Sequence, residues 1–174
     1  MNQEFFKILE ARRCVRKFKT DPVPDAVLQK IIAGAQLAPS AGNVQPWKFY
    51  IVRQQETKAL LARAAFGQQF LAQAPVVIVV VAEPELSGAK YGTRGRELYS
   101  IQDTAAAVEN ILLCATAQEL SGCWVGAFDE EATSQTLDLP PAQRPVAIIP
   151  LGYPAETPRA RKLKPAAEIL VFVD

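Results

Sequence analysis

The feature that most constrains the fold is an uninterrupted apolar run at residues 75–82, PVVIVVVA. Valine and isoleucine dominate this run, and β-branched residues favour strands. A strand with one solvated face alternates between apolar and polar residues, whereas this run does not, so we expect a strand that is covered on both faces. A second apolar run at 145–152 predicts another buried strand. The chain must therefore fold around a sheet with structure packed on each side.

Weaker patterns place the remaining elements. Further strands are expected at 48–53, 123–128 and 167–173, and helices at 4–13, 23–38, 55–64, 66–73, 98–120 and 130–137. The polar segment 83–96 contains Gly88, Gly92 and Gly95, so it is predicted to be a mobile surface loop of the kind that often caps sites. No repeat or linker interrupts the pattern. We therefore expect one α+β domain that spans residues 1–174.

The longest predicted helix, at 98–120, is apolar around much of its circumference and should be buried. Asp103 and Glu109 are its polar exceptions. For Asp103 we favour a position on the exposed side of the helix, or at a cap, over the role of a catalytic carboxylate.

Composition and charge are typical of a soluble globular protein. The chain is 49% hydrophobic and 21% charged with a net charge of +1, which indicates neither a nucleic-acid surface nor a membrane surface. Its longest apolar run is far shorter than the ~20 residues that span a bilayer. The N-terminal segment contains Glu4 and lacks an apolar core, so we expect no signal peptide and a cytoplasmic location.

The chain has no histidine and three cysteines, Cys14, Cys114 and Cys123. The absence of histidine excludes Ser-His-Asp hydrolysis, histidine-based metal catalysis and imidazole acid-base chemistry. The odd cysteine count without paired spacing favours reduced thiols, and it predicts neither a disulfide framework nor a metal site. No side chain stands out as catalytic, so if the chain is an enzyme, a bound cofactor should carry the chemistry.

Two clusters of cationic residues interrupt this nearly neutral sequence. The first surrounds Cys14 and consists of Arg12, Arg13, Arg16 and Lys17, and the second consists of Arg159, Arg161, Lys162 and Lys164. Nearby acids do not balance the first cluster, which suggests a bound anion, and arginine suits phosphate oxygens. A solvated helix end explains the same pattern equally well, because cations also favour the last turn of a helix.

The turn at residues 39–47, PSAGNVQPW, lies between a predicted helix and a predicted strand. Its two prolines and its glycine indicate an ordered turn. Asn43 and Gln45 each carry an amide donor and an amide acceptor, and such a pair can read the pyrimidine edge of a flavin. The alternative is that both amides bond only to the loop backbone, which is the more common fate of loop amides.

Four motifs occur in order along the chain: RRCVR at 12–16, PSAGNVQPW at 39–47, GCWVG at 122–126 and PLGYP at 150–154. Together they resemble the FMN-dependent nitroreductase family, in its shorter form, over nearly the whole chain. Any one motif would be weak, whereas the combination is specific. The resemblance implies a mixed, mainly antiparallel sheet flanked by helices. It also implies an intertwined homodimer in which the C-terminal segment reaches over the partner subunit.

The resemblance further implies FMN at the dimer interface and NAD(P)H as the electron donor. The cofactor-binding positions that it implies are Arg12, Arg13, Cys14, Arg16, Pro39, Ser40, Asn43, Gln45, Val125, Gly126 and Arg161. The arginines would hold the phosphate and ribityl chain, and the turn would face the flavin, in part from the partner subunit. Val125 and Gly126 would offer backbone near the reactive nitrogen of the ring. At position 14 most family members have serine, which is a better donor to phosphate than Cys14.

The implied function is electron transfer from NAD(P)H through the flavin to a nitroaromatic or quinone-like acceptor by a ping-pong mechanism. Two alternatives stay open. One is another chemistry of the superfamily, namely dehalogenation, dehydrogenation or flavin fragmentation, and the other is a flavin-binding or storage module. The spacing around Arg161 departs from the commonest family pattern, so Arg159, Lys162 or Lys164 could take its role at the phosphate.

Overall fold

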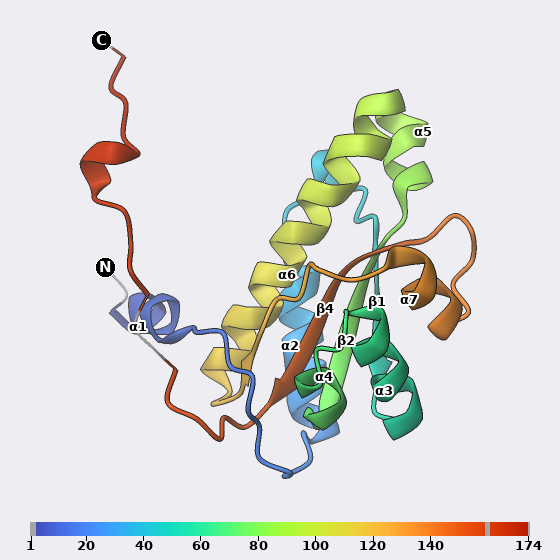
Figure 1. Ribbon diagram of the computed structural model, residues 1–174. Helices are drawn as coiled ribbons and strands as arrows, with labels where there is room; N and C mark the ends of the chain where they lie inside the picture. Colours follow the sequence, from blue (N-terminus) through green and yellow to red (C-terminus); the bar gives the residue numbers. More distant parts are fainter. Residues whose placement is uncertain (1–2, 159–160, 174) are drawn as a thin grey trace.

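The computed structural model describes residues 3–158 and 161–173 and shows a sheet enclosed by helices (Figure 1). Arg159 lies outside the described residues. The helical elements are α1 (Gln3–Ala11), α2 (Asp25–Gln36), η1 (Ala41–Asn43), α3 (Gln55–Ala64), α4 (Phe70–Gln73), α5 (Pro84–Arg94), η2 (Gly95–Tyr99), α6 (Ser100–Ala117), α7 (Glu130–Thr136) and η3 (Ala166–Glu168). The strands are β1 (Trp47–Val52), β2 (Val76–Ala82), β3 (Ser121–Gly122) and β4 (Arg144–Gly152).

The strands form a four-stranded sheet in the order β1–β2–β4–β3, and each neighbouring pair is antiparallel. β2 coincides with the predicted apolar run, and every residue in it is buried. Helices cover both faces of this strand, which explains why no polar residue interrupts the apolar run. The expected α+β class, with a mainly antiparallel sheet flanked by helices, is confirmed.

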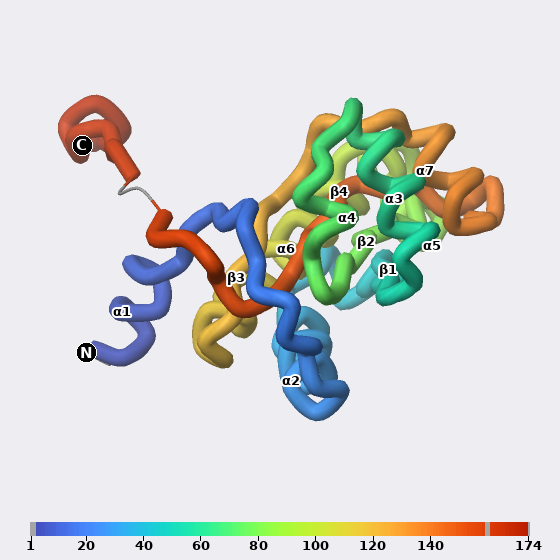
Figure 2. The backbone as a smooth tube through the Cα atoms, turned by 60° about the horizontal axis from the view of Figure 1, so that its bottom comes forward, coloured from blue at the N-terminus to red at the C-terminus, as the bar shows by residue number. Residues whose placement is uncertain are grey.

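Alternate residues of β2 contribute to two separate cores. Residues 76, 78 and 80 pack with apolar residues of α2 and α6. Residues 77, 79 and 81 pack with apolar residues of α3 and α4. The two layers of helices are visible on opposite faces of the sheet in Figures 1 and 2. Each β-branched side chain of the run therefore has a partner, because strand residues alternate in direction.

α6 packs closely against α2. A Cβ added at Gly34 would lie 2.2 Å from Cys114 Sγ. Asn110 Nδ2 donates to the Gly34 carbonyl oxygen at 3.0 Å. Glycine at position 34 lets α2 and α6 approach closely. This packing holds α6, which carries Asp103 and Glu109, against α2.

The prediction of a mobile loop at 83–96 is wrong, because this segment forms α5 and the start of η2. Gly92 has φ 59° and ψ −143°, which is not helical, so the helix is broken there. Gly95 packs against the carbonyl of Ser87, since an added Cβ would lie 2.2 Å from that oxygen. The glycines thus permit a tight helical hairpin, which projects beyond the sheet in Figure 1.

Two predicted strands also differ from the structure. Between 123 and 128 the chain makes only an isolated bridge, from Val125 to Ile148. The segment 167–173 is not a strand: it contains the end of η3 and then extends away from the sheet (Figures 1 and 2). Its apolar side chains are exposed, with Phe172 at 83% and Val173 at 92%. Among the described residues no strand pairs with this segment.

Candidate functional site

The predicted phosphate-binding arginines line a single pocket of about 500 Å³. Its lining residues are Arg12, Arg13, Cys14, Arg16, Glu156, Thr157, Pro158 and Arg161. Segments from both ends of the chain therefore meet there. We refer to this cavity as the cationic pocket.

Backbone contacts place the arginine segment beside β3 and the end of β4. Cys14 forms a bridge with Gly122, and Val15 N–H donates to the Gly122 carbonyl oxygen at 3.1 Å. Further along, Ala155 N–H donates to the Lys17 carbonyl oxygen at 2.9 Å. These bonds hold the chain from Cys14 onward in an extended conformation. Arg12 and Arg13 directly follow α1, and Arg13 donates to the Glu10 carbonyl oxygen in the last turn of that helix, so the alternative of a helix end describes these two residues but not Arg16.

The four arginines of the cationic pocket differ in their partners. Arg12 Nε lies 3.1 Å from Glu109 Oε1, and Arg161 Nη2 donates to the Leu9 carbonyl oxygen at 3.0 Å. Arg13 donates to the carbonyl oxygens of Glu10 and Arg12. Arg16 is exposed, lies 5.7 Å from the Phe70 ring centroid, and forms no ion pair with a carboxylate among the described residues. Arg16 thus has the most donors available to an incoming anion.

Glu156 supplies an internal example of anion binding in this pocket. Its Oε1 accepts from the backbone N–H groups of Arg16 at 2.7 Å and Lys17 at 3.2 Å. Successive backbone N–H groups of this kind form a cradle for anionic oxygens. No feature of the sequence around Glu156 predicted this contact, because it joins residues 140 positions apart.

Cys14 lines the cationic pocket, and Cys123 is its neighbour. Cys14 is exposed, whereas Cys123 is buried. Burial raises the pKa of the Cys123 thiol to about 12, and the neighbouring Cys14 adds to the rise while Arg16 opposes it. Cys123 therefore stays a neutral thiol at physiological pH, and it is a structural residue rather than a nucleophile.

The turn at 39–47 is ordered by its own polar groups, as predicted. Ser40 Oγ accepts from the backbone N–H of Gln45 at 3.0 Å. Gly42, Asn43 and Gln45 have φ values of 57°, 57° and 54°, which L side chains rarely adopt. Strained backbone of this kind tends to occur at functional sites. We call residues 39–47 the amide loop.

The two side-chain amides partly satisfy each other. Gln45 Nε2 donates to Asn43 Oδ1 at 3.2 Å. Asn43 Nδ2 and Gln45 Oε1 have no hydrogen-bond partner among the described residues, and both side chains belong to exposed residues. Gln45 Nε2 also lies 3.5 Å from the Asn43 backbone carbonyl oxygen, so this amide bonds in part to the loop itself. One amide donor and one amide acceptor of the loop are left free to bond to polar groups outside it.

Asp103 corrects our expectation of an exposed or capping residue. It is buried, with 6% of its surface exposed. Its Oδ1 accepts from the backbone N–H of Ala41 at 3.1 Å, and its Oδ2 is buried without a hydrogen-bond partner. Burial raises the pKa of Asp103, and the bond from Ala41 partly opposes this. Helical spacing could have revealed it, because Asp103 lies four residues before the buried Ala107 on the same face.

At the predicted positions Val125 and Gly126, some backbone groups form hydrogen bonds and others do not. The N–H and carbonyl of Val125 both bond to Ile148 at 3.0 Å. Gly126 is exposed, and its N–H has no hydrogen-bond partner in the described part of the chain. Lys162 and Lys164 are exposed and do not line the cationic pocket, which contains Arg161.

The structure does not bring the amide loop into the cationic pocket. No residue of 39–47 lines that pocket. In Figure 1 the segment that leads into β1 lies near the N-terminal end of α6, whereas α1, which directly precedes the arginine segment, lies near the opposite end of α6. The predicted site residues therefore fall into two separate groups in a single chain.

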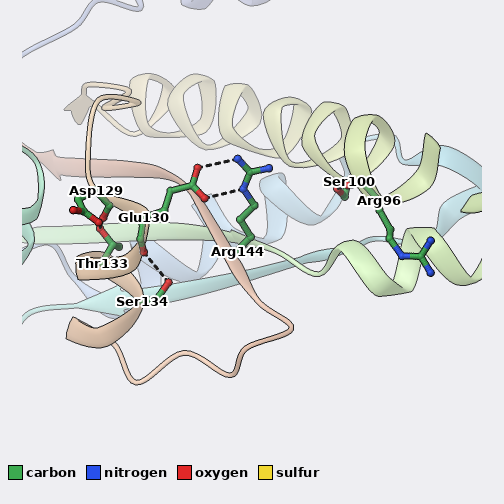
Figure 3. A network of polar contacts seen from close by, with 7 residues as sticks. All are labelled: Arg96, Ser100, Asp129, Glu130, Thr133, Ser134 and Arg144. Atoms are coloured by element: carbon green, nitrogen blue, oxygen red, sulfur yellow. Dashed lines mark hydrogen bonds and ion pairs between the residues drawn. The ribbon is translucent and has the colours of Figure 1, made fainter. Parts of the chain in front are cut away.

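Two other polar or concave regions contain none of the predicted site residues. A cavity of about 540 Å³ lies between α3 and α7 and is lined in part by Leu60, Phe66 and Gln135. Figure 3 shows the ion pair between Arg144 and Glu130, whose atoms lie 2.8 and 2.9 Å apart. The latter contact lowers the pKa of Glu130 and joins α7 to β4.

Comparisons with known proteins agree with the motifs. The family model described as Nitroreductase family matches residues 9–70 and 60–153. A putative NADH dehydrogenase/NAD(P)H nitroreductase of Archaeoglobus fulgidus is 35% identical over 158 residues, covering 88% of this chain and 87% of that protein.

Two solved structures extend this similarity to the fold. A nitroreductase family protein from Clostridium novyi NT has a TM-score of 0.80 and 35% identity, covering 87% of this chain and 86% of its own. An FMN-dependent nitroreductase from Clostridium difficile has a TM-score of 0.83 and 26% identity, covering 97% of this chain and 99% of its own.

Proposed function

The chain belongs to the nitroreductase family, and from this premise we propose that it is an NAD(P)H-dependent oxidoreductase that uses FMN. The observation that carries the proposal is the convergence of Arg12, Arg13, Arg16 and Arg161 on one pocket. FMN brings a phosphate of roughly two negative charges at neutral pH. The cationic pocket is lined by more cationic than anionic side chains, so its positive charge can neutralise the phosphate.

The chemistry of the donors fits the cofactor. Among the described residues the Arg16 guanidinium pairs with no carboxylate, and the contact of Glu156 Oε1 with the backbone N–H groups at 16 and 17 is a precedent for an anionic oxygen beside it. Arginine forks and backbone N–H groups both suit phosphate. The free donor of Asn43 and the free acceptor of Gln45 suit the pyrimidine edge of the ring, and Gly126 offers an unused N–H. Arg161 is the member of the second basic cluster that we assign to the phosphate.

When bound, FMN supplies hydride acceptance from the nicotinamide and electron delivery to the acceptor. The protein supplies binding, orientation and an open face for the substrates. No histidine is needed for this, and none is present. We propose that donor and acceptor use the same face in turn, which gives ping-pong kinetics, and that the acceptor is a nitroaromatic or quinone-like compound.

We also propose that a homodimer completes the site, with the arginines from one subunit and the amide loop from its partner. Two observations support this proposal: the amide loop does not line the cationic pocket, and the apolar residues of 169–173 have no cover in one chain. The dimer should bury more than ~2,000 Å² in total, as obligate dimers do. A protein that stays monomeric at micromolar concentration with FMN bound would contradict it.

The direct test is the visible spectrum of the freshly purified protein, followed by anaerobic addition of NADH or NADPH. We expect a yellow protein whose flavin absorbance is bleached by at least one nicotinamide. Steady-state oxidation of that nicotinamide should then depend on an added quinone or nitrofuran, with parallel double-reciprocal plots. A protein that holds FMN but is reduced by neither nicotinamide would instead be a flavin-storage module.

A further inference from the structure

The helical hairpin of α5 and η2 touches the amide loop. Lys90 Nζ donates to the Gly42 carbonyl oxygen at 3.0 Å. A Cβ added at Gly42 would lie 2.3 Å from both Lys90 Nζ and Tyr91 Oη. Glycine at 42 thus allows these two side chains to lie directly against the loop that, under the proposed function, faces the flavin.

Two tyrosines and two cations form one cluster on this hairpin. The rings of Tyr91 and Tyr99 meet edge to face with centroids 5.2 Å apart. Lys90 Nζ lies 5.6 Å from the centre of the Tyr91 ring. The Arg94 guanidinium lies 5.4 Å from the centre of the Tyr99 ring, and its Nε donates to the Tyr99 hydroxyl at 3.0 Å. We call Lys90, Tyr91, Arg94 and Tyr99 the hairpin cluster.

The charge of the hairpin cluster is not neutralised. Arg96, on the same hairpin, pairs with Glu85 at 2.9 Å. Lys90 and Arg94, by contrast, form no ion pair with any carboxylate among the described residues, and Glu97 forms none there either. Ammonium and guanidinium groups carry several donors each, and each of these two uses one. Donors therefore remain for an external anion.

The backbone fixes the cluster in place. Gly92 has φ 59° and ψ −143°, which only glycine adopts without strain, and it separates Lys90 and Tyr91 from Arg94. η2 is a π-helical turn, a rare geometry that often occurs at functional sites. The close contact of Gly95 with the Ser87 carbonyl holds the two halves of the hairpin together. An ordinary solvated helix face needs none of these features.

We propose that the hairpin cluster is a substrate subsite that selects electron acceptors in which a planar aromatic ring carries an anionic group, such as a nitrobenzoate. The tyrosines offer faces and edges for ring stacking, and the free donors of Lys90 and Arg94 bind the carboxylate. This inference rests on the proposed function, because the subsite matters for turnover only if the amide loop faces a flavin.

Direct binding tests the subsite without relying on turnover. Equilibrium dialysis with the FMN-loaded protein compares para-nitrobenzoate with its neutral methyl ester. The wild type should bind the anion more tightly than the ester. The double variant Lys90→Gln/Arg94→Gln should bind the anion about 10-fold or more weakly, the usual effect of losing hydrogen bonds to a charged group. Binding of the ester should not change.

Two further variants serve as controls. Lys30→Gln removes an exposed lysine of α2, far from the hairpin cluster in sequence, and should bind the anion like the wild type. Lys90→Arg keeps the charge and should retain most of the preference. If the wild type does not distinguish the anion from the ester, or if Lys30→Gln has the same effect as the double variant, the subsite does not exist.

Kinetics separates this inference from the proposed function. In the double variant, KM for para-nitrobenzoate should rise while kcat and the KM for NADH stay the same. If the double variant instead raises only the KM for NADPH, the hairpin cluster binds the donor's phosphate, and our assignment to the acceptor is overturned. A third outcome is that the wild type reduces no acceptor, while the double variant still binds para-nitrobenzoate more weakly than the wild type. In that case the subsite is supported and the proposed function is wrong.

Discussion

The cationic pocket and the amide loop are the two halves of the proposed site, and they are built in different ways. The pocket depends on contacts between distant segments, such as the bridge from Cys14 to Gly122 and the hydrogen bond that the Arg16 backbone N–H donates to Glu156. The amide loop depends on contacts within a few residues, such as Ser40 to Gln45, and it carries strained backbone. The pocket supplies charge on long side chains, whereas the loop supplies fixed geometry. We therefore expect the pocket to determine affinity and the loop to determine orientation.

The largest effect is expected from Arg16→Ala. In the described part of the chain Arg16 has no carboxylate partner, so its loss removes binding energy directly. FMN affinity should fall by ~1.5–3 kcal/mol, or about 10- to 150-fold. Fluorescence titration of free FMN measures the change. Arg63→Ala, an exposed arginine of α3, is the matched control and should bind FMN like the wild type. Unchanged affinity in Arg16→Ala would remove this residue from the phosphate site.

Mixed dimers of two variants test whether the two halves of the site come from different subunits. One chain carries Arg16→Ala and the other carries Asn43→Gly with Gln45→Gly, each with its own affinity tag. If each site takes its arginines from one chain and its loop from the other, the heterodimer has one intact site and one doubly altered site. It should therefore bind one FMN tightly. If both halves belong to one chain, the heterodimer has no intact site.

A smaller effect is expected from the loop substitutions alone. Asn43→Gly and Gln45→Gly keep the positive φ values accessible while they remove the two amides. Each lost neutral hydrogen bond should weaken FMN binding by ~0.5–1.5 kcal/mol. The flavin absorbance bands should also shift, because the ring loses its polar partners. Full affinity with an unshifted spectrum would show that the amides bond only to the loop itself.

Cys14→Ser should strengthen FMN binding, by about twofold to tenfold. A hydroxyl is a stronger donor to phosphate than a thiol, and Cys14 lines the cationic pocket. The same titration measures this gain. Cys114→Ser lies outside the pocket and is the control. A Cys14→Ser protein with weaker FMN binding would mean that position 14 does not face the phosphate.

The smallest effect is expected from Asp103→Asn, and it concerns stability rather than FMN. Burial raises the pKa of Asp103, so the folded state holds the proton more tightly than the unfolded state. The stability from this group is complete below its unfolded pKa of about 3.9 and is lost as pH rises through the higher folded pKa. Asp103→Asn removes this loss. Its free energy of unfolding, relative to the wild type, should therefore increase between acidic and neutral pH, by at most ~1 kcal/mol.

Urea unfolding with excess FMN at both pH values measures this difference. Arg144→Gln is an instructive contrast, because Arg144 lowers the pKa of Glu130. The stability from a carboxylate of that kind is present above its unfolded pKa and is lost as pH falls through the folded pKa. The variant should therefore lose stability mainly at neutral pH. If the difference in unfolding free energy between Asp103→Asn and the wild type does not change with pH, burial does not raise the pKa of Asp103.

The sequence by itself determined the elements that depend on local pattern. The unbroken apolar run of β2 required a strand with two covered faces, and the structure supplies two cores for its alternating residues. The residue types of the amide loop predicted an ordered turn. The spacing and order of four motifs identified the family. For the strand and the turn, the physical cause lies within about ten neighbouring residues.

Only the tertiary structure decided what depends on distant contacts. The glycines of 83–96 predicted a loop, but the segment forms a helical hairpin. Gly95 packs on the Ser87 carbonyl, and this contact brings the two halves of the hairpin together. Asp103 is buried because the amide loop folds over the start of α6, and Glu156 binds the arginine segment across 140 positions. The separation of the cationic pocket from the amide loop has the same origin. The length and rigidity of α6 set that separation, and no local pattern along the sequence records it.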